Sequence, residues 1–125
     1  MEIDRVGVVG AGQMGNGIAH VFALAGYDVV MNDIDQGALD SAMALIRKNM
    51  DRQVSRDLIA AEDRDAGLAR ISTTLKLAEL GQTDLVIEAA TERETVKTAI
   101  FEDLQPHLKP TTILTSNTSS ISITR

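Results

Sequence analysis

The sequence predicts an α/β fold: a doubly wound parallel sheet of the Rossmann type, with a long helical arm after the second strand. Short runs rich in β-branched residues alternate along the chain with segments whose apolar residues recur at helical spacing. The strand-like runs are apolar without strict alternation, which is typical of parallel strands buried on both faces. The order strand, helix, strand, helix, strand, strand, helix, strand implies right-handed crossovers and a ligand site where the strand order reverses.

Residues 3–33 form the unit around which the rest of the chain is organised. Within it, residues 6–9 predict a buried strand, and Gly10, Gly12 and Gly15 then follow the pattern G-x-G-x-x-G. Gly10 allows a tight turn, Gly12 lets the backbone approach a pyrophosphate, and Gly15 lets the next helix pack close to the sheet. The glycines therefore predict a nucleotide phosphate site.

A helix and a second strand complete this unit. Apolar residues at steps of three and four from Ile18 predict an amphipathic helix that stops at Gly26. A second apolar run at residues 29–31 leads to an acid, Asp33. The glycine pattern alone is weak evidence and also occurs in purely structural loops. Here, however, strand, glycines, helix, strand and acid occur in the required order.

The first turn of that helix supplies an anion site, because its backbone N–H groups have no partner in the helix and the helix dipole is positive there. We expect Gln13 and Met14, which open the helix, to contact the bound diphosphate. Asp33 lies about 20 residues beyond the loop, where a carboxylate accepts hydrogen bonds from a ribose 2′-OH and repels a 2′-phosphate. The sequence therefore predicts a dinucleotide cofactor, and NAD in preference to NADP.

Length and composition limit the classes to which the protein can belong. We expect residues 1–125 to form a single dinucleotide-binding domain. The sequence has no cysteine, which excludes disulfides and thiolate zinc sites, and we expect no metal. A net charge of −6 and a shortage of aromatic residues argue against nucleic acid as a partner. We expect a cytoplasmic protein without membrane contact, because neither a signal segment nor a membrane-spanning apolar run is present.

Residues 33–62 predict the long helical arm. Apolar residues recur at helical spacing over this stretch, and Asp35 is the expected N-cap. The stretch is longer than a crossover helix needs, so we expect an arm or a helical pair that protrudes from the domain. Lys48, Arg52 and Arg56 recur every fourth residue and therefore lie along one face. Such a stripe is usually a solvated surface; the alternative is a phosphate-binding face.

The second half of the chain predicts three further strands after an acid-rich break at residues 62–65. Because ligands bind beyond the carboxyl ends of parallel strands, residues 89–92 should face the cofactor. A hydroxyl-rich turn at residues 116–120 follows the last strand and, taken alone, predicts a helix cap. The expected elements are strands at 71–74, 84–89 and 112–115, a short helix at 75–80 that ends at Gly81, and a helix at 95–107.

Four segments occur in order and at compatible spacing: VGVVGAGQMGNGIA (6–19), NDID (32–35), VIEAATERETVK (86–97) and TSNTSSISIT (115–124). They resemble the cofactor domain of the L-3-hydroxyacyl-CoA dehydrogenases. The first two are common to many dinucleotide enzymes, whereas the last two are much more specific. The resemblance covers essentially the whole chain, and within the family it is strongest to the bacterial 3-hydroxybutyryl-CoA dehydrogenases.

The resemblance implies NAD as the cofactor, an acyl-CoA as the substrate, and roles for individual residues. Ser119 matches the serine that hydrogen-bonds the 3-oxygen of the substrate, which implies a catalytic, substrate-binding role beyond that of a helix cap. Lys48, Arg52 and Arg56 lie on an arm similar to the one that contacts CoA, with Arg56 where a lysine is often found. The matched cofactor positions are Asp33 at the ribose and Ala89, Glu92, Lys97 and Asn117 near the nicotinamide half of NAD.

One departure from the family pattern limits what this chain is expected to do alone. The catalytic histidine of the family, its partner glutamate and the helical C-terminal domain find no match in the sequence. His20 lies within the helix after the glycines and His107 beside a proline at a helix end, and we expect both to be structural. We therefore expect a domain cut from a larger two-domain enzyme of fatty acid metabolism, inactive by itself, whose parent forms a homodimer through the missing domain.

The parent activity that the resemblance implies is reversible hydride transfer between NAD and C3 of a short-chain 3-hydroxyacyl-CoA. Two alternatives remain. One is a non-catalytic NAD-binding module, complete as it stands, which would need a sealed sheet edge after the fifth strand. The other is a related sugar-acid dehydrogenase, because those enzymes share the turn Ser-Asn-Thr-Ser-Ser.

Overall fold

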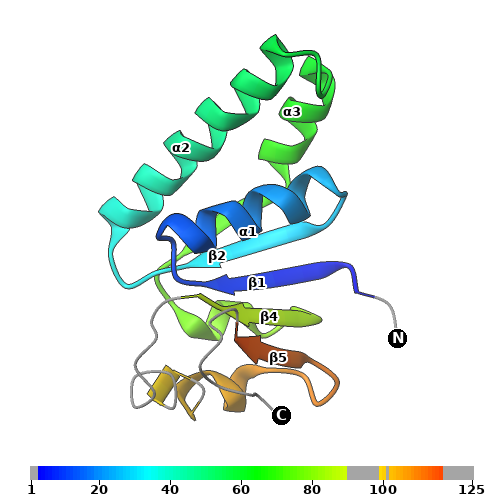
Figure 1. The fold of residues 1–125 in the computed structure, drawn as a ribbon. Coiled ribbons are helices and arrows are strands. Elements are labelled where there is room, and N and C mark those ends of the chain that lie inside the picture. The colour runs from blue at the N-terminus through cyan, green and yellow to red at the C-terminus, as the bar shows by residue number, and fades with distance from the viewer. Residues whose placement is uncertain (1–2, 90–98, 101, 117–125) are drawn as a thin grey trace.

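The computed structural model describes residues 3–89, 99–100 and 102–116, which build a five-stranded sheet (Figure 1). Every neighbouring pair of strands is parallel, and the order is β3-β2-β1-β4-β5. From the central strand β1 the chain builds outward to β3 on one side and then to β5 on the other, which confirms the doubly wound sheet. The strands are β1 (Arg5–Val9), β2 (Asp28–Asn32), β3 (Ile71–Thr74), β4 (Leu85–Glu88) and β5 (Ile113–Ser116).

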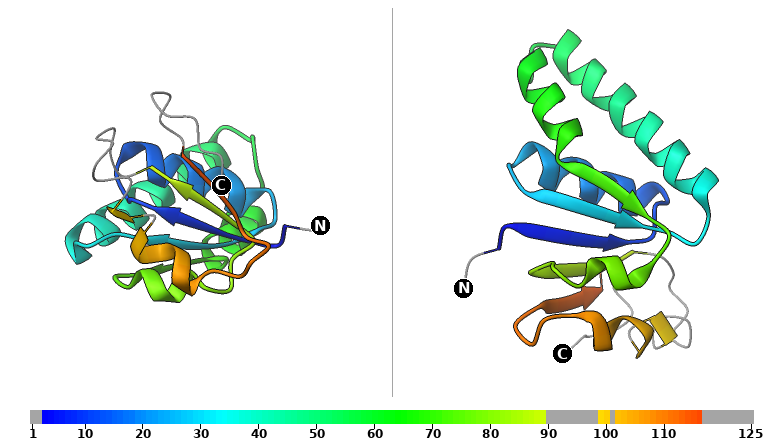
Figure 2. Two further views of the ribbon diagram at one scale, coloured as in Figure 1. Left: turned by 90° about the horizontal axis from the view of Figure 1, so that it is seen from below. Right: turned by 180° about the vertical axis from the view of Figure 1, so that it is seen from behind.

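Helices cover the two faces of the sheet unequally. One face carries α1, and α2 and α3 pack against α1 and rise away from the sheet on the side of β2 and β3 (Figures 1 and 2). In the described residues the other face carries short 3₁₀ turns and the helical residues 99–100 and 102–104. These elements are α1 (Gln13–Leu24), α2 (Gln36–Ser55), α3 (Ala61–Ala69), η1 (Leu77–Leu80) and η2 (Gln105–His107).

An apolar core lies on each face of the sheet, because alternate residues of a strand point to opposite sides. Val6 and Val8 of β1 belong to the larger core, which they share with α1, α2 and α3. Val9 packs on the other face with Leu80 and Leu104. The strands therefore read as continuous apolar runs because both of their faces are buried, as the sequence predicted.

The helix after the glycines ends where the sequence predicted. Gly26 has a φ of 106°, in the left-handed region that favours glycine. Its N–H donates to the carbonyl of Ala23 at 3.2 Å, and the N–H of Tyr27 donates to the carbonyl of Phe22 at 3.0 Å. This pair of bonds is a Schellman motif, which satisfies the last carbonyls of α1 and turns the chain into β2.

The predicted arm is a helical pair. Asp35 caps α2 as expected, because its Oδ1 accepts the N–H of Gly37 at 3.1 Å. The chain leaves α2 at Asp57, whose φ of 59° lies in the left-handed region. Arg64 of α3 then forms an ion pair with Asp51 of α2 across an N–O distance of 3.1 Å. The two helices therefore contact one another and form a single projection.

The acid-rich break predicted at residues 62–65 is wrong. These residues lie within α3, and Glu62 and Asp63 occupy its first turn. The carboxylate of Asp63 accepts the backbone N–H of Ala60 at 3.1 Å. Acidic side chains are stabilised at a helix N-terminus by the free N–H groups and the helix dipole, so these acids begin a helix.

The strands of the second half lie within one residue of their predicted positions. The helix expected at 75–80 is shorter, a single 3₁₀ turn at η1, and the helix expected at 95–107 ends in the 3₁₀ turn η2. Its first residues, 95–98, lie outside the described residues. None of the helices in the described part of the chain has the length and apolar character needed to cross a membrane.

Asp84 ties the starts of β1 and β4 together. Its Oδ2 accepts the backbone N–H groups of Asp4 and Arg5 at 2.9 and 3.1 Å, and its Oδ1 pairs with Lys109. The hydrogen bond from Lys109, followed by those from the two backbone N–H groups, lowers the pKa of Asp84 to about 2. This cluster fixes the amino-terminal edge of the sheet.

Candidate functional site

The candidate site lies at the carboxyl ends of β1 and β4, where the strand order reverses. α1, which follows β1, lies on one face of the sheet, and the described helical residues after β4 (99–100 and 102–104) lie on the opposite face, an arrangement that forms a ligand-binding crevice. Ala89 directly follows β4, and its N–H donates to the carbonyl of Val9 at 2.8 Å. The structure thus places Ala89 beside the start of the glycine loop; its contact with a cofactor stays a prediction.

The glycine loop begins at Gly10 with a left-handed φ of 104°. The Gly10 N–H donates to the carbonyl of Asn32 at 2.7 Å, which holds the turn against the end of β2. Gly15 faces this turn so closely that a Cβ on it would lie 1.7 Å from the Gly10 carbonyl oxygen. The close approach that the sequence predicted at Gly15 is therefore an approach to the backbone of the loop.

Gly12 and the first turn of α1 have the geometry of an anion site. Gly12 is the N-cap of α1, and among the described residues a Cβ on it would meet no other part of the chain within 4 Å, which leaves room for a ligand at this helix end. The first turn of α1 contains no acidic residue, and Gly12 offers no side chain to cap it. As far as the described residues go, the first-turn N–H groups, including those of Gln13 and Met14, are therefore available to a diphosphate.

A direct hydrogen bond brings Asp33 to this loop. The N–H of Ala11 donates to Asp33 Oδ2 at 3.0 Å, and the N–H of Asp35 donates to Asp33 Oδ1 at 3.0 Å. Each carboxylate oxygen keeps a further lone pair for a hydroxyl group. Ile34, the next residue, is 94% exposed, so an apolar side chain flanks the acid on the surface. The structure thus brings the glycine loop and the acid, both predicted from the sequence, into direct contact.

Two buried asparagines that the sequence analysis did not select support the loop. Asn16 donates from Nδ2 to the carbonyl of Gly12 at 3.0 Å, and Asn32 donates from Nδ2 to the carbonyl of Thr74 at 3.2 Å. Both are nearly inaccessible to solvent. An amide inside a helix or an apolar strand is unfavourable unless it is hydrogen-bonded, and this signal was available from the sequence.

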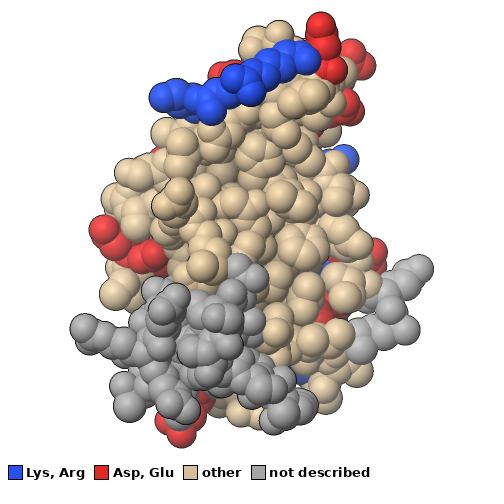
Figure 3. All heavy atoms as spheres, in the orientation of Figure 1, with Lys and Arg blue, Asp and Glu red and all other residues tan. Residues whose placement is uncertain are grey.

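The predicted basic stripe lies on the arm. Lys48 and Arg52 belong to α2, Arg56 is its C-cap, and all three are exposed. Figure 3 shows a line of basic side chains along α2, which also carries Arg47. Within the described part of the chain, none of the ion pairs involves the three predicted residues. Their charges are therefore accessible to an anionic partner.

The histidines are placed apart from the glycine loop. His20 Nε2 and Gln53 Oε1 are 2.7 Å apart, which joins α1 to α2, and His107 lies exposed in η2. The remaining positions implied by the resemblance lie outside the described residues, and their roles stay predictions: Glu92, Lys97, Asn117 and Ser119.

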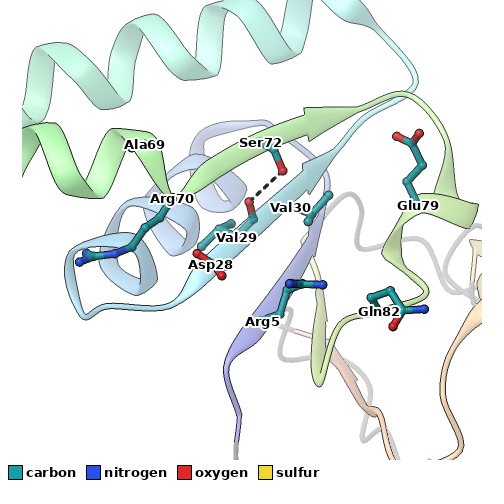
Figure 4. A pocket seen from close by; sticks show the side chains of 9 residues that line it. All are labelled: Arg5, Asp28, Val29, Val30, Ala69, Arg70, Ser72, Glu79 and Gln82. Atoms are coloured by element: carbon teal, nitrogen blue, oxygen red, sulfur yellow. Dashed lines mark hydrogen bonds between the residues drawn. The ribbon is translucent and has the colours of Figure 1, made fainter.

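A cavity of about 400 Å³ lies away from this site (Figure 4). Its wall includes Arg5 at the start of β1, Asp28 and Val30 of β2, and Glu79 of η1. Val30 belongs to the sheet face opposite α1. The cavity is therefore near the amino-terminal ends of the strands, whereas the loop follows their carboxyl ends, and we do not assign it to the cofactor.

Nearly the whole sequence matches a known family. A family model described as 3-hydroxyacyl-CoA dehydrogenase, NAD binding domain, matches residues 5–125. The chain belongs to this family. The predicted NAD cofactor and Rossmann-type fold are thereby confirmed for this NAD-binding domain.

Individual relatives agree with the family. A 3-hydroxybutyryl-CoA dehydrogenase of Bradyrhizobium diazoefficiens is 55% identical over 98% of this chain, and the match spans 42% of that protein. A 3-hydroxyadipyl-CoA dehydrogenase of Escherichia coli is 42% identical over 99% of this chain and 26% of its own length. The crystal structure of (S)-3-hydroxybutyryl-CoA dehydrogenase from Ralstonia eutropha has a TM-score of 0.93 at 41% identity, covering 98% of this chain and 43% of that one. The NAD-binding domain thus spans less than half the length of these relatives.

Proposed function

We propose that residues 1–125 are the dinucleotide-binding domain of a longer, cytoplasmic enzyme that transfers a hydride between NAD and C3 of a short-chain 3-hydroxyacyl-CoA. The observation that carries the proposal is the hydrogen bond between the Ala11 N–H and Asp33 Oδ2, because it joins the phosphate loop to the ribose acid at the switch point of the sheet. The relatives named as 3-hydroxybutyryl-CoA dehydrogenases support the reaction class.

The residues at the loop fit NAD. The open N-terminus of α1 at Gly12 suits a diphosphate, and the fixed carboxylate of Asp33 suits the two hydroxyls of a ribose. The exposed Ile34 offers an apolar surface beside that ribose for a flat base. When bound, NAD accepts or returns the hydride. The domain's own residues bind and orient the cofactor, and the acid excludes a 2′-phosphate.

The acyl-CoA substrate is proposed from the family and from the arm. Lys48, Arg52 and Arg56 present positive charge on a helix that projects from the domain, which suits the phosphates of CoA. We assign Ser119 to the 3-oxygen of the substrate, where a hydroxyl donates a hydrogen bond to a carbonyl. We assign Ala89, Glu92, Lys97 and Asn117 to the nicotinamide half of the cofactor.

The rest of the enzyme is proposed from the length of its relatives. The relatives continue well beyond the matched region, and we propose that the following domain carries the catalytic base and forms the homodimer. In this scheme the base removes the proton of the 3-hydroxyl, and the NAD-binding domain holds the hydride acceptor against C3. Fatty acid metabolism is the corresponding physiological setting.

Two titrations and one assay test this function. We expect the 125-residue chain to bind NADH and to bind NADPH much more weakly, measured by isothermal titration calorimetry. We expect the longer enzyme to reduce acetoacetyl-CoA with oxidation of NADH, followed by absorbance. Equal affinity for the two cofactors would contradict the site, whereas selective binding without turnover of any 3-oxoacyl-CoA would contradict the reaction alone.

A further inference from the structure

We propose that Asn32 is a positioning residue for the cofactor acid, and that its side chain holds Asp33 in the orientation that selects NAD over NADP. The inference rests on the proposed function, because it assigns Asp33 to the ribose. Asn32 is the last residue of β2, lies directly before Asp33, and is only 3% exposed. It does not contact the cofactor in this scheme and acts through its neighbours.

Asn32 joins the carboxyl ends of three strands. Its backbone carbonyl accepts the N–H of Gly10, the residue after β1, at 2.7 Å. Its side-chain Nδ2 donates to the carbonyl of Thr74, the last residue of β3, at 3.2 Å. One residue of the middle strand therefore ties the turn after β1 to the end of β3, immediately before the acid.

The same carbonyl also holds the acid. Thr74 accepts the backbone N–H of Asp33 at 3.2 Å, so Asn32 and Asp33 share one acceptor. The Asp33 carboxylate then accepts the N–H of Ala11 at 3.0 Å. The backbone of Asp33 is thus held by the Thr74 carbonyl, which Asn32 contacts directly. The side chain of Asp33 is held by Ala11, which follows the Gly10 turn that Asn32 contacts.

The acceptor itself is held in place. The hydroxyl of Thr74 accepts the backbone N–H of Lys76 at 3.0 Å and donates to Glu79 of η1. Because two partners from the following turn hold its hydroxyl, Thr74 offers Asn32 a carbonyl in a fixed position. A chain of contacts therefore runs from Glu79 through Thr74 and Asn32 to the acid.

Packing alone does not explain an amide at this position. A buried amide is unfavourable without partners, whereas a leucine of similar size buries its surface without that requirement. The neighbouring positions of β2 are valine and methionine, so an apolar residue suits the strand. The amide is therefore explained by what it orients.

A fixed orientation of the Asp33 carboxylate changes the affinities for NADH and NADPH in opposite directions. A fixed carboxylate offers a ribose hydroxyl a ready acceptor and places negative charge beside a 2′-phosphate. If the carboxylate is free to rotate, NADH binds more weakly because its ribose hydroxyl loses a preorganised acceptor. NADPH is then repelled less, because the negative charge can turn away from its 2′-phosphate. Selectivity is the ratio of the two affinities, so both changes lower it.

The test compares Asn32→Leu with a matched control in the 125-residue chain. Asn32→Leu should weaken NADH binding about 3- to 10-fold, the range for one hydrogen bond, and should lower the NADH-to-NADPH affinity ratio. The control is Thr83→Val, because Thr83 is 1% exposed and its hydroxyl donates to the carbonyl of Leu80 at 2.7 Å, near the start of β4. Thr83→Val also removes a hydrogen bond from a buried side chain to a backbone carbonyl. It should therefore lower the urea midpoint of unfolding but leave the NADH-to-NADPH affinity ratio unchanged.

A double variant distinguishes the positioning of Asp33 by Asn32 from a general loss of stability. In an Asp33→Ala background, Asn32→Leu should leave the ratio unchanged, because the group it orients is gone. Asn32→Ala, which cannot crowd the site, is measured alongside. If both Asn32 variants keep the wild-type ratio while Asp33→Ala abolishes it, the positioning role is wrong and the proposed function stands. A wild-type ratio of one overturns the proposed function, and this inference with it.

Discussion

The backbone N–H of Ala11, in the glycine loop, donates a hydrogen bond of 3.0 Å to Oδ2 of Asp33, at the end of β2. These residues follow β1 and β2, and the bond makes the glycine loop and the proposed ribose acid one connected unit. In the proposed function, a cofactor bound at the loop meets a carboxylate that is hydrogen-bonded to that same loop. We therefore expect substitutions in the loop or at Asp33 to change the affinity for the cofactor.

Replacing the acid should remove the preference for NAD. Asp33→Ala should weaken NADH binding by about 1–3 kcal/mol, the range for leaving hydrogen-bonding groups without a partner. NADPH should lose less, because the repulsion of its 2′-phosphate also disappears. Calorimetric titration with both cofactors measures this. Asp28→Ala, at the other end of β2, is the control and should bind like the wild type; unchanged selectivity in Asp33→Ala would refute the assignment.

Gly15 should be required for the fold rather than for the ligand alone. In Gly15→Ala the new Cβ would lie 1.7 Å from the Gly10 carbonyl oxygen, so the helix or the loop must move. Overpacking of this kind typically costs about 1–3 kcal/mol, and we expect at least that loss in urea unfolding. Gly17→Ala is the matched control, since a Cβ there meets no other described segment of the chain within 4 Å. Wild-type stability in Gly15→Ala would show that this approach is not tight.

The basic stripe should act on the acyl-CoA and not on NAD. In the longer enzyme, changing Lys48, Arg52 and Arg56 together to glutamine should raise KM for acyl-CoA, and the effect should shrink as salt screens the charges. The KM for NAD should stay constant. Arg47→Gln, next to Lys48 on α2 but outside the spacing of every fourth residue, controls for the loss of a positive charge on this helix. An unchanged KM for acyl-CoA at low ionic strength would mean that the stripe is only a solvated surface.

Asp84 should make stability depend on pH in the acid range. Its pKa is lowered from 3.8 to about 2 in the fold, so the stabilisation is fully present above the unfolded value. It is lost as the pH falls from about 4 through about 2, because the carboxylate becomes protonated. Asp84→Asn should therefore be less stable than the wild type at neutral pH, with a difference that shrinks toward pH 2. Urea unfolding across this range, with Asp28→Asn as the control, measures it; a difference independent of pH would contradict the role of the charge.

Much of the fold could be predicted because its signals are local. The strand, the glycines and the helix stop at Gly26 each depend on backbone rules that act within a few residues, and Asp35 is a cap of the same kind. The acids at residues 62–65 were misread, because acidic clusters occur both in loops and in first turns of helices. The turn at Asp57 that precedes them gives no clear sequence signal.

The site was predictable in its parts but not in its connections. The glycine pattern and Asp33 carry the chemistry of a dinucleotide site in their types and spacing. The contacts that join them depend on tertiary pairing between β1, β2 and β3. The roles of Asn32 and Thr74 follow from this pairing, and a single sequence does not contain it.

The most direct measurement of the central claim is the NADH affinity of Gly12→Val compared with that of Gly17→Val. Gly12 has a φ of −68°, which valine adopts, and at neither position would a Cβ lie within 4 Å of another described segment of the chain, so both variants should fold. If the open N-terminus of α1 holds the diphosphate, Gly12→Val should abolish NADH binding while Gly17→Val retains it. Normal NADH affinity in a folded Gly12→Val chain, verified by circular dichroism, would show that the loop is not the phosphate site.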